Sequence, residues 1–210
     1  MTKIILDLCG GTGSWSKPYK DAGYKVFNLT LPEFDITLWG VHKGFLYFPS
    51  MKTSLNDLRI NIKDVYGILA APPCTMFSVA RSNAKIPRDL AQGMLLVKKC
   101  LEVIWQVQTN HKMKFWAMEN PQGLLRWFLG KPALHFNPYE YGDPYKKRTD
   151  IWGNFNEPKK KPVKRDSSRD TAHGEDWHHN GINRPKGMDR ATFRAITPAG
   201  FAKAFFEANK

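Results

Sequence analysis

A cysteine behind two prolines is the first residue of this sequence whose chemistry stands out. The stretch APPCTMFS, residues 71–78, follows an apolar run typical of a buried strand, so Cys74 sits where the chain leaves a sheet. A thiolate is a strong nucleophile, which makes Cys74 a candidate for covalent catalysis. Free cysteine is also among the most buried residue types, and this stretch alone fits ordinary packing better.

Two further motifs follow apolar runs in the same way. The glycine turn DLCGGTG, residues 7–13, offers Asp7, and MENPQG, residues 118–123, offers Glu119. A glycine turn is often only a turn, and Glu119 could simply cap a loop. In open α/β sheets, however, ligands bind beyond the carboxyl ends of the strands. The three motifs together predict one pocket with a glycine-lined cofactor face, a thiol and a carboxyl group.

The glycine turn narrows the class of cofactor. It lacks the GxGxxG spacing of dinucleotide folds and the GK[ST] ending of a phosphate-binding loop. Glycines let the backbone approach a ligand closely. A cofactor without a pyrophosphate therefore fits better, and S-adenosylmethionine is the candidate, with Asp7 facing its charged amino-acid end.

The elements that must position these motifs alternate along the chain. The patterns predict strands over residues 3–8, 24–31, 45–48, 66–71 and 114–119, and helices over residues 15–23, 87–110, 124–130 and 196–210. The long helix should begin with Pro87 in its first turn, and SLNDLRI, residues 54–60, indicates a turn or short helix. This order predicts an α/β fold with a mostly parallel sheet covered by helices on both faces.

Composition indicates a polyanionic partner in a reducing compartment. The 210 residues carry 32 Lys and Arg against 19 Asp and Glu, a net charge of +13, which favours nucleic acid over a membrane surface because no basic amphipathic helix stands out. No run approaches the ~20 apolar residues of a membrane span. The three cysteines are widely spaced and resemble neither a disulfide framework nor a zinc site. We therefore expect a cytoplasmic protein without a metal.

The motifs also carry a family resemblance. ILDLCGGTGS, GILAAPPCTMFS and WAMENPQG resemble, in order, the first, fourth and sixth motifs of the cytosine 5-methyltransferases. YGDPYKKRTDIWGNF is similar to the eighth motif, and AITPAGFAKAFFEAN to the family's closing helix. The resemblance covers most of residues 3–155 and the last fifteen or so. It implies a single Rossmann-like class I methyltransferase domain that methylates carbon 5 of cytosine in DNA with S-adenosylmethionine. The same chemistry could act on RNA or a free nucleotide, and a catalytically dead DNA-binding or decoy protein of the same fold is a further alternative.

The resemblance assigns roles to individual residues. Cys74 would add to carbon 6 of cytosine, Glu119 would hydrogen-bond ring nitrogen 3 and the exocyclic amine, and Arg148 would assist near the thiol. Cofactor binding falls to Asp7, Cys9, Gly11, Thr12, Gly13, Asp35 and Pro72. DNA contacts are expected from Ser78, Arg81, Lys147, Lys159, Lys160, Lys161, Lys164 and Arg165.

Three positions depart from the family pattern. Thr30 stands where an acidic residue usually holds the cofactor's ribose, for which Glu33 or Asp35 could serve. Pro121 stands where valine is commoner. Arg148 is followed two residues later by Asp150, where the family usually has a second arginine.

The largest departure is the segment 156–192, which replaces a target-recognition domain. The expected organisation is a catalytic core over residues 1–155, this basic insert, and a C-terminal helix over residues 193–210 that docks on the core. The insert's lysines could bind phosphates without reading bases, or could form a solvated charged loop. Its His173, His178 and His179 are expected to be surface or DNA-facing residues rather than metal ligands. We expect a monomer in the cytoplasm, of the host cell if the protein is virus-encoded. A partner chain could supply sequence recognition.

Overall fold

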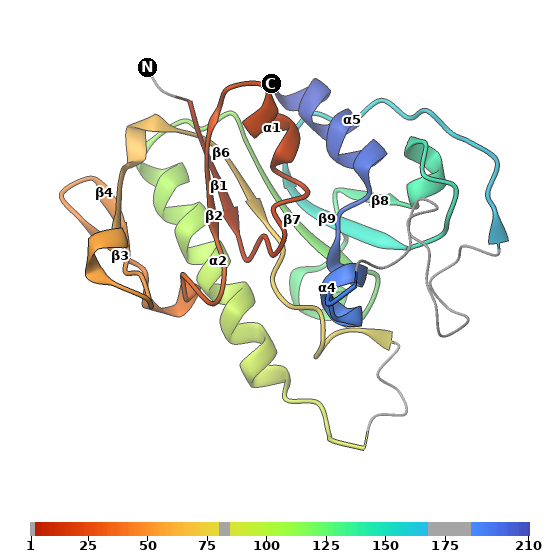
Figure 1. The fold of residues 1–210 in the computed structure, drawn as a ribbon, viewed down its shortest axis with the longest axis horizontal. Helices are drawn as coiled ribbons and strands as arrows, with labels where there is room; N and C mark the ends of the chain where they lie inside the picture. Colours follow the sequence, from red (N-terminus) through yellow and green to blue (C-terminus); the bar gives the residue numbers. More distant parts are fainter. Residues whose placement is uncertain (1–2, 80–84, 168–185) are drawn as a thin grey trace.

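A computed structural model describes residues 3–79, 85–167 and 186–210 of the protein. Its core is a six-stranded sheet in the order β2-β1-β6-β7-β9-β8 (Figure 1). The strands are β1 (Ile4–Leu8), β2 (Lys25–Leu29), β6 (Val65–Ala70), β7 (Phe115–Pro121), β8 (Leu134–Phe136) and β9 (Thr149–Asn154). The first four strands in the order are parallel, and β9 is antiparallel to both of its neighbours. The predicted mostly parallel sheet is confirmed.

Helices cover both faces of this sheet. The long helix α2 (Leu90–Asn110) packs on one face, and α1 (Lys17–Asp21) and α5 (Ala199–Asn209) pack on the other (Figure 1). Successive residues of β1 point to opposite faces, so Leu6 joins the cluster under α2 and Ile5 joins the cluster under α5. In α5, Phe205 is fully buried, and its ring centroid lies 5.4 Å from that of Trp15. The last helix, α5, and the first strand, β1, therefore contribute to the same hydrophobic cluster.

The start of α2 differs from the prediction. The helix begins at Leu90, and Asp89 caps it by accepting a hydrogen bond from the backbone nitrogen of Gln92 at 2.8 Å. Pro87 lies before the cap and not in the first turn. Asp89 outcompetes the proline as a starting signal because its side chain satisfies a backbone donor that the first turn leaves unpaired.

A second, three-stranded antiparallel sheet consists of β3 (Gly40–His42), β4 (Phe45–Phe48) and β5 (Leu58–Asn61). The predicted turn or short helix over residues 54–60 is right for the 3₁₀ turn η2 (Ser54–Asn56) and wrong for the residues from Leu58 on, which form a strand. Ile60 of that strand pairs with Leu46 of β4 and is buried. Pairing across the sheet, which no local pattern records, fixes this segment as a strand.

Short elements complete the described chain. They are α3 (Arg126–Leu129), α4 (Arg190–Ala195) and the 3₁₀ turns η1 (Ile36–Leu38), η3 (Ile62–Asp64) and η5 (Pro138–Tyr141). The basic segment 156–166 forms neither helix nor strand and runs beside η5, where the backbone nitrogen of Val163 donates to the carbonyl of Tyr139 at 2.8 Å. Within the described ranges, no helix is long and apolar enough to cross a membrane.

Candidate active site

The three motifs meet at the carboxyl ends of the parallel strands of the main sheet. β1, β6 and β7 are parallel, and their carboxyl ends point the same way (Figure 1). The backbone nitrogen of Ala71 donates to the carbonyl of Leu8 at 2.9 Å, and Nδ2 of the buried Asn120 donates to the carbonyl of Pro72 at 2.9 Å. The glycine turn, the proline-proline-cysteine loop and the Glu119 segment therefore form one continuous surface.

Asp7 is a fully buried carboxylate under the glycine turn. Its Oδ2 accepts a hydrogen bond from Oγ of Ser16 at 2.5 Å, while Oδ1 has no partner among the residues described. Burial raises the pKa of Asp7 from 3.8 to about 6, against the lowering effect of the Ser16 bond. A Cβ on Gly10 would lie 2.3 Å from Cγ of Asp7, so only glycine lets the turn close over this carboxyl group.

Asn28, at the end of β2, is a second polar side chain on this part of the site. Its Nδ2 donates to the carbonyl of Gly11 at 2.9 Å, and its buried Oδ1 is another acceptor without a partner in the described chain. The sequence prediction missed Asn28. Asn28 could have been found by aligning the two predicted strands, because it pairs directly with Asp7 across β1 and β2.

Four of the other expected cofactor residues belong to this turn. Gly11 and Thr12 are exposed, Gly13 and Cys9 are partly buried, and Cys9 has a left-handed φ of 55°. Asp35 is partly buried and caps η1 by accepting from the backbone nitrogen of Thr37 at 2.8 Å. Their contacts with a cofactor stay predictions.

Cys74 begins a tight turn that several groups hold in place. Its carbonyl accepts hydrogen bonds from the backbone nitrogens of Phe77 and Ser78, both at 2.9 Å. From the segment before α2, Arg88 donates through Nη1 to the carbonyl of Met76 at 2.8 Å and through Nη2 to that of Ser78 at 2.9 Å. Sequence reasoning did not single out Arg88, because its contacts are with backbone atoms and leave no sequence pattern.

The Cys74 turn is also joined to the segment after Glu119. The backbone nitrogen of Leu124 donates to the carbonyl of Phe77 at 2.9 Å, and a Cβ on Gly123 would lie 2.3 Å from that same oxygen. Ser78 and Gly123 form an isolated antiparallel bridge. The thiol and the carboxyl group are thus carried by backbone segments that pack directly on each other.

Burial and nearby charges shift the pKa of the Cys74 thiol. Burial, and then the negative charge of Glu119, raise the pKa of Cys74, whereas the positive charges of Lys147 and Arg194 lower it. Burial raises the pKa of Glu119, which Lys147 opposes. Both reactive groups are therefore biased toward their neutral forms, and Lys147 is the cation that acts on both.

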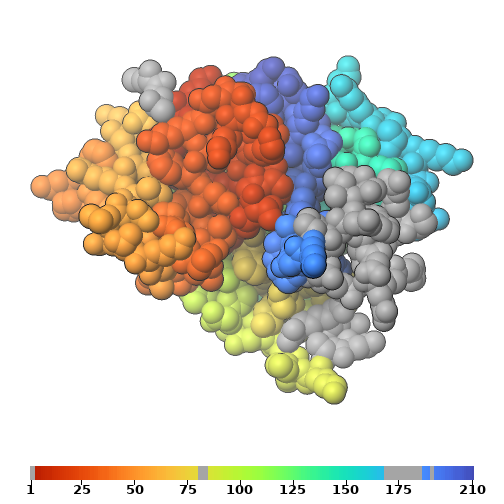
Figure 2. All heavy atoms as spheres, viewed as in Figure 1, coloured from red at the N-terminus to blue at the C-terminus, as the bar shows by residue number. Residues whose placement is uncertain are grey.

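Lys147 links the eighth-motif segment to the C-terminal part of the chain. Its Nζ donates to the carbonyl of Arg194 in α4 at 3.0 Å. The backbone nitrogen of Thr197 donates to Oγ of Ser14 at 2.9 Å, and Figure 2 shows the blue C-terminal segment against the red N-terminal one. The residues around α4 therefore border both the glycine turn and Cys74. Sequence reasoning missed Arg194.

Arg148, which was expected to assist the thiol, is exposed, and its carbonyl accepts from the backbone nitrogen of Gln122 at 2.9 Å. Its charge is not among those that shift the pKa of Cys74, in contrast to Lys147 and Arg194. A catalytic role for Arg148 stays a prediction.

The expected DNA contacts are dispersed. Ser78 is partly buried, and Lys160 forms an ion pair with Glu140 at 2.7 Å. Five of the expected contacts are exposed along the basic segment: Lys159, Lys160, Lys161, Lys164 and Arg165. Arg81 and the three histidines of the insert, His173, His178 and His179, lie outside the described residues.

Asp150, the departure from the eighth motif, is a fully buried carboxylate with three close side-chain contacts. Arg126 of α3 donates to it through Nε at 2.5 Å and through Nη2 at 2.6 Å, and Nδ1 of His135 lies 2.7 Å from Oδ1. A bidentate arginine pair of this kind fixes both side chains. The negative charge of Asp150 also contributes to the raised pKa of Glu119.

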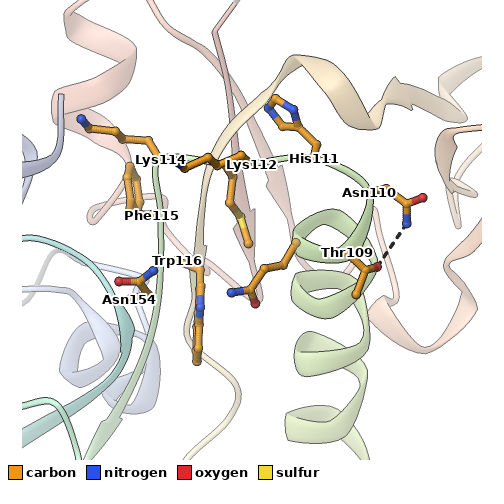
Figure 3. A pocket seen from close by; sticks show the side chains of 10 residues that line it. Thr109, Asn110, His111, Lys112, Lys114, Phe115, Trp116 and Asn154 are labelled. Carbon is orange, nitrogen blue, oxygen red and sulfur yellow. Dashed lines mark hydrogen bonds between the residues drawn. The ribbon is translucent and has the colours of Figure 1, made fainter.

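A separate cavity of about 480 Å³ lies at the opposite end of the strands, beside the amino-terminal end of β7. It is formed where the end of α2 meets the start of β7, and Figure 3 shows Asn110, Lys114 and Trp116 around it. Because Glu119 lies near the opposite end of β7, this cavity is distinct from the site of the three motifs. Among the described residues, no group of three or more His, Cys, Asp or Glu side chains could hold a metal ion.

Comparison with known proteins agrees with this arrangement. No protein-family model matches the chain. The chain is similar to the type II methyltransferase M.DdeI of Desulfomicrobium norvegicum, with 30% identity over 132 residues that cover 58% of this chain and 28% of that protein. The sheet with its helices on both faces, taken with this similarity, defines an α/β Rossmann-like methyltransferase fold. The similarity supports a relationship to methyltransferases. The chain spans under a third of the length of this relative.

Proposed function

We propose that this protein transfers a methyl group from S-adenosylmethionine to carbon 5 of cytosine in DNA. One observation carries the proposal: a cysteine and a glutamate follow neighbouring strands closely enough for Glu119 to raise the pKa of Cys74, beside a glycine turn over a buried carboxylate. The similarity to a type II methyltransferase supports the reaction class. The motif resemblance supports the choice of cytosine carbon 5.

The glycine-turn side fits the proposed cofactor. Oδ1 of Asp7 and Oδ1 of Asn28 are buried acceptors without partners in the described chain, and buried acceptors of this kind call for donors from a ligand. With a pKa of about 6, Asp7 is mostly ionised at neutral pH and suits a cationic amino group. S-adenosylmethionine carries such a group and supplies an electrophilic methyl. In this account Asp7 holds the amino-acid end, and Asn28 accepts from a further donor.

The chain's own residues provide the covalent chemistry. Sγ of Cys74 gives up its proton to water and adds to carbon 6 of cytosine, which pushes the electrons of the 5,6 double bond toward carbon 5 and the ring. Glu119 has a raised pKa, so its neutral carboxyl can donate a hydrogen bond to ring nitrogen 3 as negative charge develops there. Lys147 and Arg194 favour the thiolate. Once carbon 5 carries the methyl group, it loses its proton to water. The electron pair of that C–H bond forms the 5,6 double bond again as Sγ leaves carbon 6 with the electrons of the C–S bond.

DNA is the proposed substrate because the protein is strongly basic. A net charge of +13 and the exposed cations of the segment 156–166 suit a phosphate backbone. In a duplex the cytosine must first leave the base stack to reach Cys74. Competition among duplex DNA, transfer RNA and deoxycytidine monophosphate separates this proposal from action on RNA or on a free nucleotide.

Transfer of tritium from labelled S-adenosylmethionine to cytosine-containing DNA tests the proposed function. The wild type should label the DNA, and Cys74→Ala should abolish labelling. The neighbouring exposed residue provides a matched control, and Thr75→Ala should keep activity within about threefold. Full transfer by Cys74→Ala would remove Cys74 from the mechanism. No calorimetric binding of the cofactor by the wild type at millimolar concentration would favour a catalytically dead DNA-binding protein.

A further inference from the structure

A strongly exposed tryptophan stands beside the proposed active site. Trp127 is 86% exposed and Phe128 is 48% exposed, and both belong to the short helix α3 that follows the Glu119 segment. A large aromatic side chain so open to water loses the favourable burial of its apolar surface. No pairing, packing or capping role within the described fold accounts for the indole of Trp127.

α3 is nevertheless a firmly attached element. Leu125, at its start, is fully buried, and the indole nitrogen of Trp152 donates to the carbonyl of Gly130, at its end, at 3.1 Å. Between these anchors Arg126 is held by two hydrogen bonds to the buried Asp150. The fold therefore presents Trp127 on a fixed support, which lowers the conformational entropy cost of binding a ligand there.

The same support touches the turn that carries Cys74. The ring centroid of Phe128 lies 6.1 Å from that of Phe77, edge to face, and Leu124 donates its backbone nitrogen to the carbonyl of Phe77. A molecule seated at Cys74 thus has α3 as an immediate neighbour. α3, which carries Trp127, therefore adjoins the Cys74 turn, whereas Trp105, which is 69% exposed, lies in the carboxyl-terminal half of α2.

Arg126, the residue before Trp127 in α3, carries a guanidinium that is ion-paired with the buried Asp150. Hydrogen bonds to Asp150 raise the pKa of Arg126, so the guanidinium is permanently charged. Its Nε and Nη2 face Asp150, whereas Nη1 has no hydrogen-bond partner in the described part of the chain. A cation with a spare donor beside an exposed indole matches a phosphate next to a base, and the net charge of +13 favours such a partner.

We propose that Arg126 and Trp127 form a DNA contact, in which Trp127 stacks on an unstacked base next to the target cytosine and Arg126 binds a phosphate through Nη1. The proposal rests on the proposed function for its substrate and adds a recognition element outside the basic insert. It also gives Asp150 a role, because this carboxylate fixes an arginine from α3 at the edge of the site.

Binding of a fluorescently labelled, cytosine-containing DNA duplex tests the contact. Trp127→Ala should raise the dissociation constant by about 5- to 100-fold, the effect of removing one base-aromatic stack. Trp127→Phe keeps an aromatic face and should recover most of the affinity, whereas Trp127→Leu should not. The matched control is Trp105→Ala, which should change the affinity less than twofold. Because Trp127 is exposed, these variants should unfold at the same temperature as the wild type.

Other outcomes overturn the contact. Equal affinities for Trp127→Ala and Trp105→Ala would do so, as would full recovery with Trp127→Leu, since a stack needs a π face. Tighter, Trp127-dependent binding to a single-stranded RNA of the same sequence would remove the DNA assignment. The proposed function fails separately, when wild-type protein binds the duplex with Trp127 dependence but transfers no methyl group to it.

Discussion

At the scale of single residues, burial and local charge determine the protonation state of the side chains in the candidate site. Cys74 and Glu119 both have raised pKa values, chiefly because each is partly withdrawn from water. Lys147 offsets part of this for both groups, and Asp7 remains available to a cation at neutral pH. Burial thus favours the neutral thiol of Cys74, and the positive charges of Lys147 and Arg194 favour the thiolate that the proposed mechanism needs.

Removing the charge of Lys147 should make Cys74 less reactive. Lys147→Met takes away the first cation that lowers the pKa of Cys74, so less thiolate is present at a given pH. We expect the rate of Cys74 alkylation by iodoacetamide at pH 8, followed by peptide mass spectrometry, to fall about threefold or more. Lys146→Met serves as the neighbouring control and should leave the rate unchanged, because Lys146 is not among the charges that shift the pKa of Cys74. Equal effects of the two substitutions would contradict the assignment of Lys147.

The buried Asp7 should make stability depend on pH. Its pKa is about 6 in the folded protein and near 3.8 in the unfolded chain, so the folded state holds the extra proton between these values. The stabilising contribution of Asp7 is full below pH 4 and is lost as pH rises through 6, an effect of up to about 3 kcal/mol.

Asp7→Asn should reveal this dependence. The variant has no carboxyl to ionise, so its free energy of unfolding in urea should exceed that of the wild type at pH 8 by about 1–3 kcal/mol more than at pH 4. Its affinity for S-adenosylmethionine should fall, because an amide does not pair with a cationic amino group. The same stability difference at both pH values would show that Asp7 does not titrate in this range.

At the scale of elements, the sequence predicts what repeats locally and misses what depends on distant partners. The parallel strands β1, β6 and β7 are strong apolar runs, and the glycine after α1 and after α3 marks each helix end. β3, β8 and β5 are short and owe their state to pairing with neighbours. Such pairing has no local period.

The candidate site divides in the same way. Motif residues such as Cys74 and Glu119 could be identified from their positions after predicted strands. Three further residues act on the thiol or on its turn: Arg88, Lys147 and Arg194. They act through hydrogen bonds to backbone atoms or through charge, and both depend on parts of the chain that are distant in sequence. Only the structure therefore shows their role. Asn28 is intermediate, since the register with Asp7 would have indicated it.

The joint between the Cys74 turn and the Glu119 segment should tolerate no side chain at Gly123. In Gly123→Ala the new Cβ would lie 2.3 Å from the carbonyl oxygen of Phe77, a backbone atom that cannot move alone. We expect a loss of about 2 kcal/mol or more in the free energy of unfolding, with a fall in methyl transfer. The control is Gly40→Ala in β3, where no atom lies within 4 Å of the added Cβ. Comparable stability of both variants in urea would show that the joint is not tight.

At the scale of the whole molecule, two features bear on the proposed function: the packing of the C-terminal residues on the N-terminal ones, and the surplus of positive charge. α5 and the residues before it pack against α1 and the glycine turn, so residues 197–209 complete the part of the molecule to which we assign cofactor binding. The described basic segment adds exposed cations beside η5. Binding to DNA should therefore combine a fixed site with a diffuse electrostatic contribution.

That electrostatic part should appear in the salt dependence of binding. Removing one lysine that binds a phosphate should reduce the slope of log affinity against log salt by about 0.9. Replacing Lys159, Lys161 and Lys164 together by Gln should therefore lower the slope by about 2 to 3, measured from about 50 to 300 mM salt. Lys160→Gln alone should change it by less, because Lys160 already pairs with Glu140. An unchanged slope in the triple variant would assign these lysines to the solvated surface.

The most direct measurement of the central claim is covalent trapping on DNA that contains 5-fluorocytosine. Fluorine cannot leave carbon 5 as the proton does, so the bond between Sγ and carbon 6 should persist once the methyl group has been transferred. In the presence of S-adenosylmethionine the wild type should form a denaturation-resistant adduct, with peptide mass spectrometry placing the nucleotide on Cys74, and Cys74→Ala should form none. Methylation of ordinary DNA without any adduct on the fluorinated DNA would contradict the account.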